Sequence, residues 1–364
     1  MRTVCTLNTC NGCRACSDKC NYEAIHISDE YSWMNAYIDP SRCINCNQCI
    51  NVCPNNHPVE MKKPIIWKQG WACSEDIREK ASSGGIASAI IESFILNGGY
   101  VCTCKYENGS FIFCCTNNLD EIGGYAGSKY VKSNAKGAYR IVEQKLKEGQ
   151  KVLFIGLPCQ SAALLRYIPL KYHNLLYRID LICHGTPSPE LLESFIKKEK
   201  IDIGIVRDVS FRQKDKFVIS IKQKEGKEKS IPNDIYMHAF LDGIDYTLNC
   251  YKCTYAQTRR CSDITLGDSW GTELKNEAPK GVSLVLCQTE KGKELIRMSD
   301  IHLEDVNIDR AIQYNHQLMH PTTINSKTDL FFRTYRKTKS FSCGIFRIEP
   351  FFYIKQRIKA IIYK

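Results

Sequence analysis

Long apolar runs are missing from this sequence, and their absence excludes two classes of protein. The first residues, MRTVCTLNTC, hold no apolar core of the length that a signal peptide needs. No run of about 18 uncharged apolar residues is present either, so no transmembrane helix is expected. The chain does carry 21 cysteines. Without an export signal, we expect these cysteines to bind metal or clusters in a reducing cytoplasm rather than to form disulfides.

A GxGxxG fingerprint is also absent, so a Rossmann dinucleotide site has no support. Low-complexity and disorder-prone segments are absent as well. The 364 residues are 43% apolar, as in ordinary globular proteins. This length suggests about two or three domains.

The formal net charge is +11 and is concentrated at one end of the chain. Residues 333–364 hold nine Lys and Arg against one acid, whereas residues 1–63 hold six of each. Bound 4Fe-4S clusters would offset more of the excess, because a cluster with four thiolates carries a net charge of about −2. We therefore expect a nearly neutral body with a basic tail at 331–364, and no nucleic-acid partner.

In this tail, Ile354, Ile358, Ile361 and Ile362 recur at helical spacing among lysines and arginines. Such a basic amphipathic helix suits a membrane surface or an acidic partner, which would place the protein at the inner face of a membrane. The simpler expectation is a helix that packs on its own domain and exposes a basic rim to solvent.

The most specific motif is CxxCxxCxxxC, which occurs twice with an offset of 33 residues, at 10–20 and 43–53. Three cysteines on one tight loop suit three irons of a cubic cluster, and in two-cluster ferredoxins the last cysteine of each run serves the other cluster. Structural zinc sites use pairs of CxxC hairpins instead. We therefore predict a two-cluster ferredoxin domain at 1–62. Its predicted ligands are Cys10, Cys13, Cys16 and Cys53 for one 4Fe-4S cluster, and Cys43, Cys46, Cys49 and Cys20 for the other. Cys5 falls outside the pattern and is expected to be a spare apolar residue.

Residues 61–72 are expected to be a linker, because Pro64 and Gly70 interrupt them. Residues 73–330 alternate strand and helix patterns, including strand-turn-helix units that start at VLFIGLPC and YRIDLICHG. GGYVCTCKY with SFIFCCTN, and DVSFRQ with KFVISIKQ, are typical of paired strands. This alternation favours a mixed sheet with substantial parallel pairing and flanking helices, in the α/β or α+β class.

Two cysteines of this larger part lie where a strand turns into a helix, namely Cys159 in IGLPCQ and Cys183 in ICHG. A helix N-terminus lowers a thiol pKa, which suits a nucleophile or an iron ligand, although a buried thiol is the commonest fate of a cysteine. The stretch NCYKCTYAQTRRC adds Cys250, Cys253 and Cys261. The loop SSGG precedes a predicted helix and suits either a phosphate or a tight packing turn.

An ordered set of segments resembles the beta subunit of the coenzyme F420-reducing hydrogenases, a family that includes F420-linked formate dehydrogenase subunits. The segments are SSGG at 82–85, GSKYVKS at 127–133, IGLPCQ at 155–160, ICHG at 182–185, CYKC at 250–253, SDITLGDSWG at 262–271 and GVSLVLCQTEKG at 281–292. The resemblance covers residues 73–300. It implies FAD and a third 4Fe-4S cluster in a domain at 73–330.

The resemblance also implies residue roles. The third cluster's implied ligands are Cys159, Cys183, Cys250 and Cys253, with Cys261 as a neighbour or alternative ligand. The implied cofactor contacts are Ser83, Gly84, Gly85, Lys129, Tyr130, Ser133 and Asp268. Lys129 would stabilise a reduced flavin or a phosphate by its charge, unless it is a solvated lysine. His184 is a further candidate proton donor, although a lone histidine is more often structural.

These parts predict an oxidoreductase in which FAD converts between electron pairs and the single electrons of clusters. The expected partners are a soluble ferredoxin or other redox protein and a small-molecule hydride donor or acceptor. Electron flow from ferredoxin toward a bound substrate is favoured over flow from reduced F420 to a partner. Two alternatives remain open. One is an electron-transfer subunit of a larger complex without its own substrate, and the other is a zinc-binding module without flavin.

Overall fold

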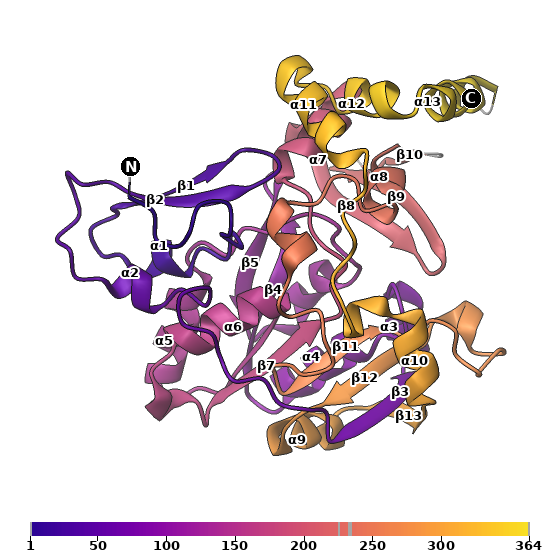
Figure 1. Cartoon of the computed structure of the whole chain (residues 1–364). Helices are drawn as coiled ribbons and strands as arrows, with labels where there is room; N and C mark the ends of the chain where they lie inside the picture. Colours follow the sequence, from indigo (N-terminus) through magenta and orange to yellow (C-terminus); the bar gives the residue numbers. More distant parts are fainter. Residues whose placement is uncertain (1, 225, 232–234, 363–364) are drawn as a thin grey trace.

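The computed structural model describes residues 2–224, 226–231 and 235–362. It joins a small N-terminal unit to a large mixed sheet, with a second, smaller sheet beside the C-terminal helices (Figure 1). The predicted class, a ferredoxin-like unit followed by a mixed-sheet domain with flanking helices, is confirmed.

The N-terminal unit is a structural repeat as well as a sequence repeat. Its elements are α1 (Ala15–Lys19), β1 (Ile25–Asp29), β2 (Met34–Ile38) and α2 (Gln48–Asn51). Strands β1 and β2 pair antiparallel. Helix α2 begins 33 residues after α1, and each helix follows a residue in the left-handed region, Arg14 at φ 66° and Asn47 at φ 57°. The two cysteine runs therefore form equivalent loops that lead into equivalent short helices.

The large sheet has eight strands in the order β13-β3-β12-β11-β7-β6-β4-β5. Their bounds are β3 Ile66–Ala72, β4 Tyr100–Glu107, β5 Ser110–Thr116, β6 Val152–Gly156, β7 Leu176–Leu181, β11 Ile264–Asp268, β12 Ser283–Cys287 and β13 Ile301–Asp305. The central strands β11, β7, β6 and β4 pair in parallel, and the outer ones pair antiparallel. The expected parallel core is confirmed, and so is the antiparallel pairing of β4 with β5.

The expected linker at 61–72 is wrong in its second half. Strand β3 pairs with both β12 and β13, so the chain enters the large sheet at Ile66. Gly70 was taken as a loop signal, but it serves close packing, since a Cβ there would lie 1.9 Å from the carbonyl oxygen of His302.

Helices cover both faces of the large sheet, because alternate residues of its strands belong to different apolar clusters. Phe154 of β6 packs with the N-terminal unit and the helices α5 (Ala138–Lys147) and α6 (Pro158–Tyr167). Leu153 and Ile155 pack with α4 (Ile86–Leu96) and α9 (Glu290–Met298) on the opposite face. The strands are thus buried on both faces, as parallel sheets usually are.

The second sheet is antiparallel and has the order β10-β9-β8. Its strands are β8 (Val206–Gln213), β9 (Lys216–Gln223) and β10 (Glu228–Ile231), so the predicted hairpin is confirmed. The remaining helices are α3 Glu75–Lys80, α7 Pro189–Lys198, α8 Ile235–Leu241, α10 Ile308–Tyr314, α11 Thr328–Thr338, α12 Phe341–Ile348 and α13 Pro350–Ile362, with 3-10 turns η1 Leu119–Tyr125, η2 Leu170–Tyr172, η3 Ile203–Ile205, η4 Leu248–Lys252, η5 Ala278–Lys280 and η6 His316–Leu318.

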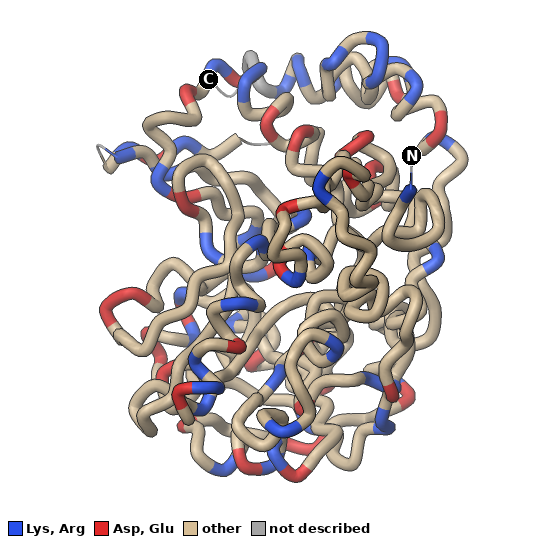
Figure 2. The backbone as a smooth tube through the Cα atoms, turned by 90° about the vertical axis from the view of Figure 1, so that its left-hand side faces the viewer, with Lys and Arg blue, Asp and Glu red and all other residues tan. Residues whose placement is uncertain are grey.

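The segment expected as a tail is only partly a tail. Helix α11 begins before residue 331, and Phe331 and Phe341 are buried in the apolar cluster of the second sheet. Helix α13 is the expected helix, and Figure 2 shows Lys and Arg along the C-terminal helices. Its Phe351 is 86% exposed, and Ile354 and Ile358 are about half exposed, whereas the side chains of Ile361 and Ile362 lie outside the described part. None of the described helices is long and apolar enough to cross a membrane. Contact with a membrane surface stays a prediction.

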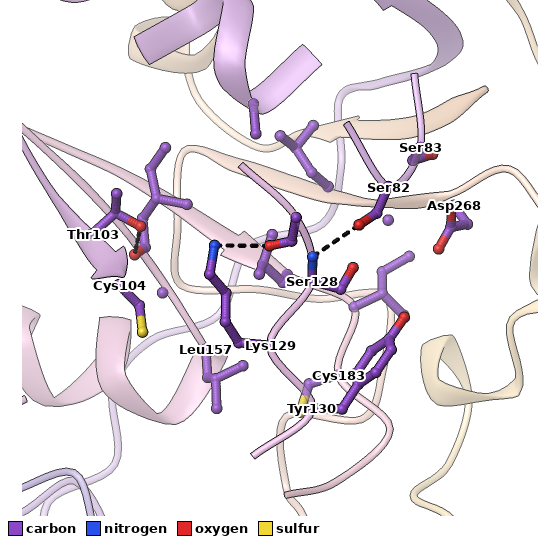
Figure 3. Close-up of a pocket in the computed structure, with 18 of the residues that line it drawn as sticks. Ser82, Ser83, Thr103, Cys104, Ser128, Lys129, Tyr130, Leu157, Cys183 and Asp268 are labelled. Carbon is purple, nitrogen blue, oxygen red and sulfur yellow. Dashed lines mark hydrogen bonds between the residues drawn. The ribbon is translucent and has the colours of Figure 1, made fainter. Parts of the chain in front are cut away.

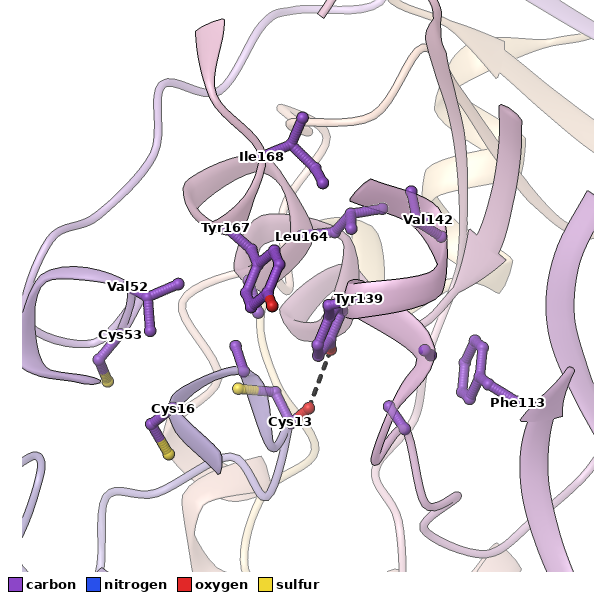
Figure 4. Packing of buried hydrophobic residues seen from close by; sticks show 14 of the residues in the cluster. Cys13, Cys16, Val52, Cys53, Phe113, Tyr139, Val142, Leu164, Tyr167 and Ile168 are labelled. Atoms are coloured by element: carbon purple, nitrogen blue, oxygen red, sulfur yellow. Dashed lines mark hydrogen bonds between the residues drawn. The ribbon is translucent and has the colours of Figure 1, made fainter. Parts of the chain in front are cut away.

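The N-terminal unit docks on α5 and α6 through one continuous apolar cluster (Figure 4). Cys13, Cys16 and Val52 share this cluster with Tyr139 and Tyr167. The Tyr139 hydroxyl donates a 2.9 Å hydrogen bond to the carbonyl oxygen of Cys13. The loop of the first cysteine run is therefore fixed against the large sheet.

Candidate functional site

Two small cavities in the N-terminal unit are lined by the cysteine sets that the repeat predicts. Cys10, Cys13, Cys16 and Cys53 line one cavity, and Cys20, Cys43, Cys46 and Cys49 line the other. Each set combines three cysteines of one run with the last cysteine of the other. Burial raises the pKa of Cys13 to about 11, so a metal charge is needed to hold this thiol as a thiolate at neutral pH. Four sulfur donors around a small cavity fit an iron-sulfur cluster.

Cys5 is not a spare residue remote from these cavities. It is buried, lines the first cavity and is hydrogen-bonded with Cys10 and Cys53. The spacing alone gave no signal for this position, because Cys5 lies outside both runs.

A third set of cysteines converges at one edge of the large sheet. Cys159 lies in the first turn of α6, Cys183 follows β7, and Cys250 and Cys253 lie in and after η4. Burial raises the pKa of Cys183 to about 12, and repulsion from Cys250 and Cys253 adds to the shift. Burial likewise raises the pKa of Cys159, with further repulsion from Cys253 and Cys183. The fold therefore brings the four implied ligands close together.

Cys261 lies next to this set but faces other partners. It is buried in a small apolar cluster with Ala162 and Tyr255, against which Cys159 and Cys253 also pack. Its thiol is hydrogen-bonded with Ser161. The position fits the neighbour role that the resemblance implies.

The largest cavity, with a volume of about 260 Å³, opens on the other side of Cys183 (Figure 3). This volume is near the lower end of that of pockets for drug-sized ligands. Predicted cofactor contacts that line the cavity are Ser83, Gly85, Lys129, Tyr130, Ser133 and Asp268, together with His184. Gly84 is not among the lining residues, because it serves the close packing of β3 on β12. A Cβ there would lie 2.4 Å from the carbonyl oxygen of Gly70.

One end of the cavity is suited to an anion. Helix α4 starts after Gly85, which has φ 83° and provides no side-chain cap. The first residues of α4, Ile86, Ala87 and Ser88, line the cavity. Free backbone N–H groups and the helix dipole at this end favour a phosphate, as a flavin nucleotide would supply. The residues present therefore fit FAD at this end.

Lys129 is neither a solvated lysine nor a free charge. Its Nζ donates hydrogen bonds to the carbonyl oxygens of Tyr125, Ala126 and Gly127 at 2.6, 2.7 and 2.9 Å. Burial lowers its pKa. Lys129 thus shapes the loop that forms one wall of the cavity.

The opposite wall contains an ion pair whose cation the sequence analysis missed. Arg212 of β8 donates to both carboxylate oxygens of Asp268, at 2.6 and 2.9 Å, and stacks 4.8 Å from the Trp270 ring centre. Tyr130 stacks on Phe240 nearby, with ring centres 4.5 Å apart. The sequence signal for Arg212 was a charged residue within a predicted strand, which carries little information on its own.

His184 is held as a neutral imidazole at neutral pH. Burial lowers its pKa to about 4, and its Nδ1 lies 2.7 Å from the amide nitrogen of Gln317. It can orient a polar ligand, but it carries no imidazolium proton to donate at pH 7.

The four sites lie next to one another in a fixed order. Cys183 belongs to the third cysteine set and also lines the large cavity. Asn249, beside Cys250, donates a 3.4 Å hydrogen bond to Asn11 in the loop of the first run. The charge of Cys49 raises the pKa of Cys16 after the larger effect of burial, so the two ferredoxin sets are neighbours too. The order is cavity, third set, first ferredoxin set and second ferredoxin set.

Comparison with known proteins agrees with this geometry. Residues 9–57 match the model of the 4Fe-4S dicluster domain, and residues 149–309 match that of the C terminus of the coenzyme F420 hydrogenase/dehydrogenase beta subunit. The coenzyme F420-dependent sulfite reductase of Methanocaldococcus jannaschii is 44% identical over 329 residues, which cover 77% of this chain and 49% of that protein. The chain thus spans about half the length of this curated relative.

A chain of the F420-reducing NiFe hydrogenase complex from Methanosarcina barkeri is similar in structure, with a TM-score of 0.49 and 17% identity, over 77% of this chain and 96% of that one. Together with the sequence matches, the cysteine sets give this protein its place: it joins a 4Fe-4S dicluster domain at 9–57 to a unit of the coenzyme F420 hydrogenase/dehydrogenase beta subunit family.

Proposed function

We propose that this chain is an iron-sulfur flavoprotein oxidoreductase that passes electrons between FAD in the large cavity and three 4Fe-4S clusters. The observation that carries the proposal is the shared wall, because Cys183 lines the cavity and also belongs to the third cysteine set. FAD, when bound, exchanges electron pairs with organic molecules and single electrons with clusters.

The chain's own residues bind and orient the cofactor in this proposal. The N–H groups at the start of α4 bind the phosphates, and Leu181, Leu266 and Trp270 provide apolar walls that exclude water. Lys129 fixes the loop above the cavity through its three carbonyl contacts. The neutral His184 and the Arg212–Asp268 pair supply polar groups that orient a substrate.

A soluble ferredoxin is the proposed one-electron partner, since the ferredoxin domain is fused to the same chain. The two-electron partner is a small hydride donor or acceptor. The sulfite reductase relative is named for its dependence on coenzyme F420, so this coenzyme is the first such molecule to test.

A second candidate function is electron transfer within a larger assembly, without a substrate of the chain's own. It is favoured by the length of the sulfite reductase relative, of which this chain covers only 49%. In that case the purified chain would accept electrons but would reduce no small molecule by itself.

Anaerobic stopped-flow spectroscopy of the FAD-loaded protein tests the proposal. Reduced ferredoxin should bleach the flavin absorbance in wild type and more slowly in Cys159→Ser. The matched control is Cys343→Ser, because Cys343 is exposed in α12 and lines none of the three cavities. A protein that binds no flavin would overturn the proposal. If only reduced F420 bleaches the flavin, the ferredoxin-to-substrate direction is wrong.

A further inference from the structure

A buried lysine lies where the ferredoxin domain meets the third cysteine set. Lys132 is only 6% exposed. Its Nζ donates a 3.1 Å hydrogen bond to the carbonyl oxygen of Asn11, and its backbone N–H donates to Pro187. Its side chain runs across the first cysteine loop, because a Cβ on Gly12 would lie 3.0 Å from the Cδ of Lys132.

Sulfur atoms of two different sites surround this ammonium group. Burial alone would lower the pKa of Lys132, but the charges of cysteines from both sites leave it raised. The cysteines concerned are Cys250, Cys159 and Cys183 of the third set and Cys10 of the first ferredoxin set. In return, Lys132 lowers the pKa of Cys13, Cys159 and Cys183 against the larger, opposite effect of burial. The lysine thus faces both cysteine sets.

Within the described residues, no salt bridge joins Lys132 to a carboxylate. A buried ammonium group with one neutral acceptor is costly unless a negative charge compensates it. Two 4Fe-4S clusters, each with a net charge of about −2, would supply that charge from both sides. The position is therefore explained by anionic clusters.

We propose that Lys132 is a positioning and tuning residue between the third cluster and the first ferredoxin cluster, whose fixed charge raises the reduction potential of both. The inference rests on the proposed function for the third cluster. Each added electron makes a cluster more negative, so a nearby cation stabilises the reduced state more than the oxidised state. The low dielectric of the buried site strengthens this effect.

The effect should be unequal among the three clusters. The second ferredoxin set is absent from the cysteines that act on Lys132. Its potential should respond least. Lys132 would thus make the two inner clusters easier to reduce than the outer one, and electrons that enter at the outer cluster would move inward.

An anaerobic redox titration followed by electron paramagnetic resonance tests the proposal on the holo-protein. In Lys132→Met, the midpoint potentials of two clusters should fall while that of the third stays near its wild-type value. Lys132→Arg keeps the charge and should restore most of the shift. Lys136→Met removes an exposed lysine four residues away and should change none of the potentials.

Iron content separates the outcomes. About twelve irons in wild type and unchanged potentials in Lys132→Met would overturn the role of Lys132 and leave the proposed function intact. About eight irons in wild type would remove the third cluster, and with it both the proposed function and the bridge. If Lys132→Met loses iron, Lys132→Gln and Lys132→Arg decide: equal potentials in these two variants would overturn the proposal, and a lower potential in the Gln variant would support it.

Discussion

The carboxylate of Asp18 accepts hydrogen bonds from the backbone N–H groups of Gly137 and Tyr139, at 2.7 and 3.2 Å. Asp18 lies in α1 of the ferredoxin domain, and the two donors lie at the start of α5 in the large domain. The carboxylate therefore caps a helix of the neighbouring domain and fixes the ferredoxin domain on the sheet.

Asp18→Ala should loosen this docking. Loss of a helix cap costs about 1 kcal/mol, and the change also removes a favourable charge at the N-terminus of α5. Thermal unfolding of the cluster-loaded protein should show a lower Tm. The exposed Glu60 makes no side-chain bond within the described residues, so Glu60→Ala is the control that should leave Tm unchanged. Equal Tm values for the two variants would contradict the capping role.

Gly85→Ala should weaken flavin binding. Gly85 has φ 83°, so alanine there costs about 1–2 kcal/mol, and its Cβ would lie 3.2 Å from Arg78 Cα. Gly98 is the matched control, because its φ is 80° and no atom lies within 4 Å of an added Cβ. Both variants should lose stability, but only Gly85→Ala should lower the flavin content per chain. A similar flavin loss in both would point to general destabilisation instead.

Asp268→Asn should destabilise the cavity wall. The Arg212 side chain is 4% exposed and would lose its anionic partner, at a cost below the about 3–5 kcal/mol of a fully buried pair because Asp268 is 23% exposed. The comparison is Asp305→Asn, which breaks an ion pair with Lys68 at the surface and should leave stability unchanged. Chemical denaturation of both variants measures the difference, and equal midpoints would refute the structural role of the Arg212 pair.

The ferredoxin domain was predictable almost completely from sequence. The repeat at 10–20 and 43–53 fixes the crossed cysteine sets, because loop spacing and cluster geometry leave few alternatives. The parallel core was predictable from strand-turn-helix order. In contrast, β3 was hidden by Pro64 and Gly70, since local turn signals do not reveal that tertiary packing needs a glycine in a strand.

Residues that depend on long-range contacts were the ones that sequence analysis missed. Arg212 and Lys132 resemble ordinary charged residues until the fold places one against Asp268 and the other between two cysteine sets. Cys5 was also misplaced, because its neighbours come from the end of the second run as well as from the first. No local spacing encodes such contacts.

Iron and flavin content after anaerobic purification tests the central claim most directly. The account predicts about twelve irons and one FAD per chain, from three four-iron clusters. Cys183→Ser should lose about four irons, and Cys261→Ser should keep all twelve. Eight irons in wild type, or the loss of four irons from Cys261→Ser but not from Cys183→Ser, would contradict it.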